Sequence, residues 1–344
     1  MFMKKLILSV FLVGVLVVLG ACGSNSDTKV TTSAPGSSSE SIVLKFGHHL
    51  AENHTLGQQA ELFAKLIEEK TDGRISVDVY ANGQIGDQRD LIEGLKIGTV
   101  DMSLGDTAVV SNYYTPLGIL DLPQMFGSME EGMEIVQGEL GDVIKEEIEQ
   151  EIGIKTLAIE PVGYRFTVLG ESKKVGSLDE FNGLKLRTLE SPQIVGTFKE
   201  LGVQTVALPT GEALSAMETG VVDGLESNAE FLSTINIWDL GKYIVETNHN
   251  LTFETINISK ATWEKLSADD QKLIEETIDE TIDVYFEESL KMNVEARELM
   301  EEKGMETLDV DVTEMNGISE KVTEDYVKAN NLQKYYEIIK KAKE

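Results

Sequence analysis

The sequence predicts an α/β protein built from two lobes of similar construction. In the first half, strand-like apolar stretches alternate with amphipathic helical stretches, in the order strand, helix, strand, helix, strand. This alternation is typical of βα units and of a mostly parallel sheet. A strand, a helix and a further strand follow again between residues 202 and 223. About 300 residues remain after the N-terminal leader, which is enough for two domains with their own cores.

The first 22 residues predict an export signal that ends at a lipid attachment site. Lys4 and Lys5 precede an apolar core, residues 6–19, that is short for a membrane span and ends in small residues, as signal peptides do. The only cysteine, Cys22, closes the segment LGAC, which is typical of a bacterial lipobox. We therefore expect lipid attachment at Cys22, and no thiol remains for a disulfide, a metal site or a nucleophile.

Residues 23–41 are rich in Gly, Ser, Thr and Asn and predict a flexible tether. The formal charge of the chain is −30, and removal of the signal with its two lysines and no acids gives −30 − 2 = −32. A surface this acidic argues against nucleic acid or anionic lipid as a partner of the folded part. It leaves room for an anionic ligand, because exposed charges are screened beyond about 8–10 Å and a few arginines in a cleft can dominate locally.

The first half can be divided at its glycines and helix-capping residues. Apolar residues recur at helical spacing after Thr55, and Asp87 is placed to open a second helix. The expected elements are a strand over 43–47, a helix from 55 to about 73, a strand over 75–79, a turn over 83–86, a helix over 87–96 and a strand entered at 98–102.

The second half repeats part of this pattern. A short strand over 183–188 carries Arg187 near its end, and a strand over 202–208 and a helix over 210–219 follow. In both halves a helix begins at an acid and ends in Gly-x-Val-Asp, at Gly98 and at Gly220. Each glycine is predicted to take the positive φ that stops a helix before a buried strand. Such junctions are common, so the repeat alone does not establish a duplication.

The C-terminal third is predicted to be mainly helical. Residues 251–259 alternate apolar and polar side chains, as in a strand that returns between the lobes, and residues 262–303 form a long acidic helical stretch. The sequence Ser267-Ala268-Asp269-Asp270 has a capping pattern that is expected to divide this stretch. A final helix is expected over roughly residues 313–343.

Arginine is used sparingly, with five residues among the 30 basic ones. Arg89, Arg165 and Arg187 fall at the edges of predicted strands or at loop-to-helix junctions. A guanidinium can clasp a carboxylate through two parallel hydrogen bonds, which lysine cannot do. For any one of them, a surface ion pair with a neighbouring acid is the simpler interpretation.

Known catalytic motifs are missing from the sequence: it contains no GxSxG, HExxH, P-loop or GxGxxG. Three of the four histidines, His48, His49 and His54, cluster after the first strand, where parallel α/β sheets bind ligands. Without a second ligand set at zinc-like spacing we expect no metal site, and no cofactor. One of these histidines is a candidate to hydrogen-bond a ligand hydroxyl.

Several motifs resemble one family. They are, in order, LKFGHH, EEKTDGRISVDVYANGQIGDQRDLIEGLKIGTVDM, LPQMF, GYRFTV, FNGLKLRT, METGVVDGLESN and TNH. They resemble the DctP-like substrate-binding proteins of TRAP transporters, from about residue 42 to the C-terminus. The resemblance implies a periplasmic-binding-protein-like fold, two α/β domains joined by hinge strands and a long helix. Lobe I would contain residues 42–164 and about 253–295, and lobe II residues 165–252 and about 296–344.

The resemblance also implies site residues. Arg187 falls on the arginine that clasps the ligand carboxylate in this family, and Arg165 falls on a second arginine that often supports it. Arg89 lies where the first lobe would face the cleft, with a helix-surface salt bridge as an equal alternative. His49 and His249 are further candidates for ligand contact.

Two positions depart from the family pattern. The family has an asparagine after the glutamate of its VDGxEN motif, whereas this chain has Ser227 followed by Asn228. An aromatic residue is common two positions before Glu212, and here it is Thr210. Ser227, Asn228 and Thr210 are all included among the candidate ligand contacts, and the two departures point to an unusual ligand.

The leading functional hypothesis is an extracytoplasmic, lipid-anchored receptor that hands a small organic acid to membrane permease subunits. A sugar acid or uronate is favoured, because the expected lining mixes arginines with His49, Ser227 and Asn228. A four-carbon dicarboxylate or a keto acid is the alternative within the family. A surface-anchored hydrolase and a ligand sensor or adhesion module are the alternatives of other classes.

Overall fold

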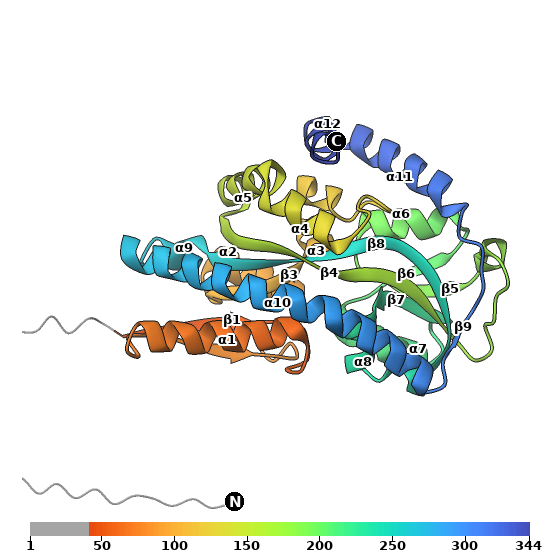
Figure 1. The fold of residues 1–344 in the computed structure, drawn as a ribbon, viewed down its shortest axis with the longest axis horizontal. Coiled ribbons are helices and arrows are strands. Elements are labelled where there is room, and N and C mark those ends of the chain that lie inside the picture. The colour runs from red at the N-terminus through yellow and green to blue at the C-terminus, as the bar shows by residue number, and fades with distance from the viewer. Residues whose placement is uncertain (1–40) are drawn as a thin grey trace, which may run out of the picture. The chain divides into compact units, whose positions relative to one another are not determined.

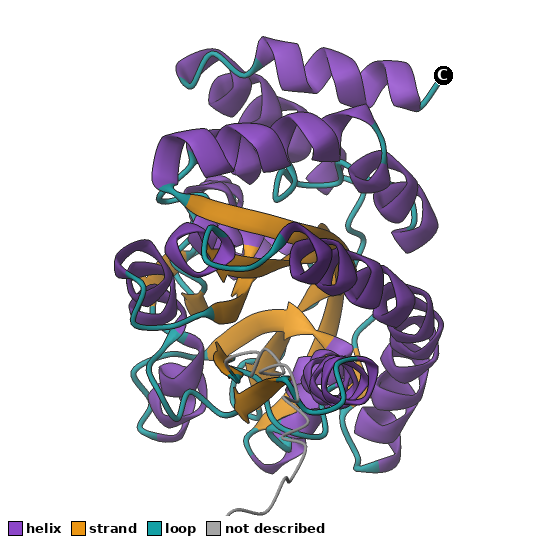
Figure 2. Ribbon diagram, turned by 90° about the vertical axis from the view of Figure 1, so that its left-hand side faces the viewer, coloured by secondary structure: helices purple, strands orange, loops and turns teal. Residues whose placement is uncertain are grey.

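The computed structural model describes residues 41–344, which form one mixed sheet with helices on both of its faces (Figure 1, Figure 2). The strand order is β2-β1-β3-β8-β4-β7-β5-β6, with β9 paired to β8. The strands are β1 (Ile42–Gly47), β2 (Ile75–Tyr80), β3 (Met102–Asp106), β4 (Ile154–Gly170), β5 (Lys185–Thr188), β6 (Gln204–Ala207), β7 (Gly224–Asn228), β8 (Gly241–Ser259) and β9 (Glu306–Thr307). The predicted signal peptide, Cys22 and almost all of the predicted tether lie outside the described residues.

Two long antiparallel strands form the middle of the sheet. β4 has 17 residues and β8 has 19, and they join a parallel group, β2-β1-β3, to a second parallel group, β7-β5-β6. The expectation of a mostly parallel sheet is therefore right within each group and wrong for the centre, where β3 and β7 also pair antiparallel with β8 and β4. The predicted strand over 251–259 is the second part of β8.

The helices cover both faces of this sheet (Figure 2). They are α1 (Thr55–Lys70), α2 (Gln88–Ile97), α3 (Thr107–Val110), α4 (Met129–Gln137), α5 (Glu139–Ile152), α6 (Pro192–Glu200), α7 (Ala213–Glu218), α8 (Ala229–Thr234), α9 (Lys260–Trp263), α10 (Ala268–Glu302), α11 (Met315–Ala329) and α12 (Gln333–Ala342), with short 3-10 turns that include η3 (Thr210–Glu212). No helix among residues 41–344 is long and apolar enough to cross a membrane.

Local sequence signals explain several helix ends. Asp87 caps α2 in a reciprocal capping box with Asp90. Gly98 and Gly220 have φ of 73° and 72°, which confirms the predicted left-handed conformation after α2 and at the end of the α7 segment. α1 begins one residue away from the expected cap, because the Nδ1 atom of His54 accepts the hydrogen bond from the Leu56 amide.

The C-terminal helices agree with the prediction in part. Ser267 caps α10, so the long stretch is divided where the capping pattern indicates. α10 is 35 residues long and packs on α1, β4 and α8 (Figure 1). The single final helix was a wrong prediction: α11 and α12 are separated at Asn331, whose φ of 57° is incompatible with a continuing helix.

The apolar residues form two buried clusters on opposite faces of the sheet. Neighbouring residues of β8 belong to different clusters, Ile244 to one and Val245 to the other, as expected for a strand covered on both faces. Each cluster contains residues from both halves of the chain: one includes Phe46 and Leu225, the other Leu91 and Leu186. The cores are therefore divided by sheet face, and each of them spans the chain.

Candidate functional site

Two adjoining cavities lie where the ends of strands from both parallel groups approach the central strands. The first, here called the arginine cavity, is lined by the polar residues His49, His54, Asp106, Arg165, Arg187, Thr210, Ser227, Asn228, Thr252 and Glu254. The second, here called the outer cavity, is lined by the polar residues His49, Asn82, Asp87, Gln88, Arg89, Glu190 and Thr210. They share His49, Leu189 and Thr210, so they form one connected region. Their volumes are about 20 Å³ and 190 Å³.

Six of the eight predicted ligand residues line the arginine cavity: Arg187, Arg165, Ser227, Asn228, His49 and Thr210. Arg89 lines only the outer cavity, and His249 lines neither. Sequence positions from 49 to 228 are thus brought together by the sheet. Among residues 41–344 no group of three or more His, Cys, Asp or Glu side chains is arranged to hold a metal ion.

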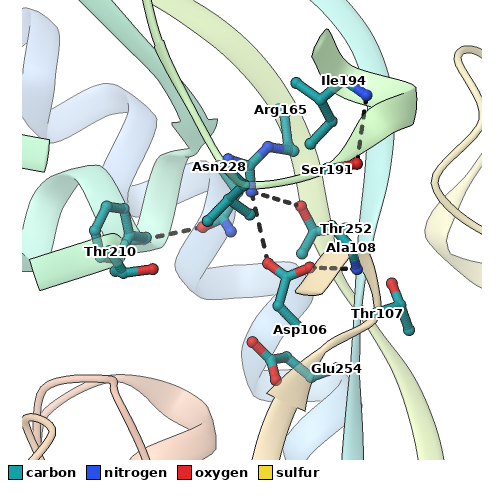
Figure 3. Close-up of polar contacts among 12 residues, drawn as sticks. Asp106, Thr107, Ala108, Arg165, Ser191, Ile194, Thr210, Asn228, Thr252 and Glu254 are labelled. Atoms are coloured by element: carbon teal, nitrogen blue, oxygen red, sulfur yellow. Dashed lines mark hydrogen bonds and ion pairs between the residues drawn. The ribbon is translucent and has the colours of Figure 1, made fainter. Parts of the chain in front are cut away.

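Arg165 is held by a buried carboxylate. It lies on β4, and its Nε and Nη2 atoms donate to the two carboxylate oxygens of Glu226 at 2.5 and 2.9 Å. Its Nη1 donates to Thr252 at 3.3 Å and lies 3.9 Å from Asp106 (Figure 3). Burial alone would raise the pKa of Glu226, but the Arg165 charge and the hydrogen bonds from His249 and Arg165 lower it to about 2. Arg165 is therefore already neutralised by the protein.

Arg187 has a different environment. It is the third residue of β5 and is only 1% exposed. Its Nε and Nη2 atoms donate to the carbonyl oxygen of Leu208 at 3.1 and 2.7 Å. No ion pair within 4.0 Å joins it to a carboxylate of residues 41–344. Burial lowers the pKa of Arg187 to about 10, so the guanidinium is still charged at neutral pH. It is a buried cation that faces a cavity without a direct anionic partner in the described chain.

Ser227 and Asn228 end β7 beside this cation, and each is 4% exposed. The Oδ1 atom of Asn228 accepts from the Phe231 amide at 2.9 Å and so caps α8. The Nδ2 group of Asn228 is left as a donor, and the Ser227 hydroxyl also makes no hydrogen bond within residues 41–344. Both side chains can therefore contact a ligand.

Thr210 is hydrogen-bonded across the site to Gln88, which lies on α2. The Nε2 atom of Gln88 donates to the Thr210 hydroxyl at 3.4 Å, and the Oε1 atom of Gln88 accepts from the Asp106 amide at 2.8 Å. Next to this contact, Arg89 forms an ion pair with Glu190 at 2.8 Å, while the Arg89 side chain is 52% exposed. Arg89 therefore forms a surface salt bridge, which was one of its two predicted roles, and it also lines the outer cavity.

His249 lies behind the arginines. Its Nε2 lies 3.1 Å from Glu226 and its Nδ1 2.9 Å from the Thr247 hydroxyl. A neutral ring that donates from Nε2 and accepts at Nδ1 satisfies both contacts, and burial lowers the pKa of His249. We therefore expect His249 to affect ligand binding only indirectly, because it orients the Glu226 carboxylate that holds Arg165.

Four polar residues of the arginine cavity are not among the eight predicted ligand residues: His54, which the sequence placed in its histidine cluster, and Asp106, Thr252 and Glu254, which sequence reasoning missed. Asp106 is the last residue of β3, and ligand groups gather at the carboxyl ends of parallel strands. That rule could have identified Asp106. The sequence carries no comparable signal for Glu254, because its place depends on the pairing of β8 with β3.

Comparisons with known proteins agree with this geometry. The family described as bacterial extracellular solute-binding protein, family 7 (DctP), matches residues 46–331. The C4-dicarboxylate-binding periplasmic protein DctP of Rhodobacter capsulatus is 28% identical over 83% of this chain and 85% of its own length. The 2,3-diketo-L-gulonate-binding periplasmic protein YiaO of Escherichia coli is 25% identical over 67% of this chain and 70% of its own length.

Solved structures show the same fold. A TRAP periplasmic solute-binding protein from Roseobacter denitrificans with bound L-galactonate has a TM-score of 0.80 at 26% identity, over 89% of this chain and 99% of its own. One from Haemophilus influenzae with bound L-gulonate has a TM-score of 0.83 at 24% identity, over 88% and 99%. These matches confirm the predicted two-lobed fold class and the resemblance seen in the sequence. The chain belongs to the DctP-like family of bacterial extracellular solute-binding proteins, the receptors of TRAP transporters, and is a binding protein rather than an enzyme.

Proposed function

We propose that this receptor captures a small organic acid by pairing the ligand carboxylate with Arg187 and delivers it to membrane permease subunits. The observation that supports this most strongly is the burial of Arg187 without a direct carboxylate partner among residues 41–344. A buried charge is costly unless it is paired and hydrogen-bonded. A ligand carboxylate would supply the missing charge and could accept two parallel hydrogen bonds only by engaging the side of the guanidinium turned away from Leu208.

In this proposal Arg165 has a supporting role. Its charge is compensated by Glu226, so its contribution is to fix the position of the β7 end, where Ser227 and Asn228 lie. The Asn228 amide and the Ser227 hydroxyl are then available to a second ligand oxygen. The family asparagine role would be taken by Asn228, because its Nδ2 group remains free while its Oδ1 caps α8.

A sugar acid or uronate is the favoured ligand class. The wall of the arginine cavity is rich in hydrogen-bonding groups, including His49, Thr210 and Thr252, and relatives of this fold have been solved with L-gulonate and L-galactonate. A four-carbon dicarboxylate is the second candidate, favoured by the name of the Rhodobacter capsulatus relative.

Ligand entry requires the two walls to separate. The arginine cavity of about 20 Å³ offers roughly the space that one water molecule needs. The two proposed lobes would separate at the contact of Gln88 with Thr210. Lobe I would contain residues 42–164 and about 253–295, and lobe II residues 165–252 and about 296–344.

The remaining parts of the proposal are lipid attachment at Cys22 and the tether over 23–41, which would hold the receptor at the membrane.

A thermal-shift and calorimetry screen tests the proposed function. L-galactonate, L-gulonate, D-galacturonate and succinate are compared with galactose, which has hydroxyls and no carboxylate. We expect stabilisation by one or more of the acids and none by galactose. Stabilisation by the neutral sugar alone would contradict the carboxylate clasp.

A further inference from the structure

Glu254 is a buried carboxyl group in the wall of the arginine cavity that the carboxylate clasp does not use. It lies on β8 and is 3% exposed. Its Oε1 is 3.5 Å from the Nε2 atom of His49, and its Oε2 has no hydrogen-bond partner among residues 41–344. The Nδ1 atom of His49 is also buried without a partner in this range. A buried polar atom left unpaired costs about 1–3 kcal/mol, so both atoms favour a bound polar group.

The strand register places Glu254 in a row of three carboxyl groups. Asp106 on β3 and Glu160 on β4 are its direct partners on either side, and side chains in such positions lie on the same face of a sheet. Figure 3 shows the Glu254 carboxyl beside Asp106. Two members of the row are occupied, since Asp106 accepts from the Ala108 amide at 2.9 Å and both oxygens of Glu160 accept from Gln59 at 3.0 and 3.1 Å.

Glu254 is thus the member of the row that combines a place in the cavity wall with an unpaired oxygen. Burial and the neighbouring Asp106 and Asp121 raise its pKa well above the usual value. Protonated or not, a carboxyl oxygen can hydrogen-bond a hydroxyl group. The same burial and the same neighbouring acids would also disfavour a second ligand carboxylate at this end, because they oppose any further negative charge there.

We infer that Glu254 is a specificity-determining residue that hydrogen-bonds a hydroxyl group of the ligand and disfavours a second carboxylate at this end of the arginine cavity. The inference rests on the proposed function, because it assumes that Arg187 holds the first carboxylate. It deepens that function by selecting monocarboxylic polyhydroxy acids over dicarboxylates. His49 is a positioning residue, which keeps the Glu254 side chain against the cavity.

Calorimetry of the full-length protein with three probe acids tests this inference. The probes are L-galactonate, hexanoate, which has the same number of carbons and no hydroxyl, and succinate. For Glu254→Leu we expect at least a tenfold loss of galactonate affinity, the loss of one hydrogen bond to a charged or strongly polar group. Hexanoate affinity should stay within about threefold, because its contacts do not include the Glu254 oxygens.

Glu254→Gln keeps the shape and replaces the titratable carboxyl group with an amide, which can donate a hydrogen bond to a second ligand carboxylate without first binding a proton. We expect this variant to bring the galactonate-to-succinate affinity ratio at least tenfold closer to one. Glu160→Gln is the matched control, because it alters the neighbouring carboxyl of the same row, which does not line either cavity. Its ratios should equal those of the parent. Affinity ratios are measured within each protein, so partial unfolding of a variant does not change them.

Unchanged galactonate-to-hexanoate and galactonate-to-succinate ratios in both Glu254 variants would overturn the inference and leave the carboxylate clasp intact. A parent protein that binds none of the three acids would overturn the proposed function and the inference together. A parent that prefers succinate to galactonate would overturn the inference alone.

Discussion

Replacement of Arg187 should weaken ligand binding strongly and leave the stability of the ligand-free protein nearly unchanged. A buried ion pair broken by removal of one partner costs about 3–5 kcal/mol, and 1.4 kcal/mol corresponds to about tenfold in affinity. Arg187→Met should therefore weaken binding of the acid by roughly two to three and a half powers of ten. Arg187→Lys should also bind poorly, because an ammonium cannot form two parallel hydrogen bonds with a carboxylate.

The ligand-free Arg187→Met protein should be nearly as stable as the parent. The substitution removes two hydrogen bonds to the Leu208 carbonyl, at a cost of about 1–3 kcal/mol. It also removes a buried charge that has no direct carboxylate partner among residues 41–344, and this offsets the lost hydrogen bonds because an unpaired buried charge is costly. We expect a free energy of unfolding within about 1 kcal/mol of the parent.

Arg165→Met is the matched control. It leaves the Glu226 carboxylate buried without its bidentate partner and should cost about 3–5 kcal/mol of stability. Urea unfolding measures stability, and calorimetry with the acid found in the screen measures binding. Parent-like affinity in Arg187→Met would refute the clasp. A stability loss as large as that of Arg165→Met would show that Arg187 is a structural residue.

Three further predictions concern stability and pH. Burial raises the pKa of Glu160 to about 8, so its contribution to stability is complete below the unfolded pKa, about 4.3, and is lost as the pH rises to 8. In the parent, the urea midpoint of unfolding should therefore decrease between pH 5 and 8, and Glu160→Gln should make this decrease smaller. Glu287→Gln, at an exposed position, should leave the decrease unchanged. Gly163→Ala should destabilise the fold in thermal unfolding, because φ is 159° and an added Cβ would lie 2.3 Å from the Oδ1 atom of Asn293; an unchanged midpoint would contradict this contact. Asn228→Ala should lower the free energy of unfolding by about 1 kcal/mol through loss of the α8 cap and weaken acid binding, whereas Asn228→Asp should keep the cap and lose only the binding.

The sequence allowed accurate prediction where structure depends on neighbouring residues. The ends of α2 follow from Asp87 and Gly98, and the start of α10 follows from Ser267. The candidate residues Arg187 and Thr210 came from family motifs, and the structure brings both to one cavity.

Features that depend on pairing between distant strands could not be predicted in this way. β4 is buried along most of both faces and contains Glu160, Arg165 and Thr167, so it lacks the alternation that identifies a strand. Glu254 gains its importance only from the register that sets it between Asp106 and Glu160. The break between α11 and α12 depends on one left-handed residue in an otherwise helical pattern.

The place of β8 has a consequence for the order in which the protein can fold. β8 lies between β3 and β4, although it follows both in the chain. The strands of residues 42–170 therefore cannot be joined into the final sheet until residues 241–259 have been synthesised. Most of the ordering cost precedes these distant contacts, which slows folding. A nascent chain shorter than about 259 residues would keep its sheet open along the line that β8 later fills.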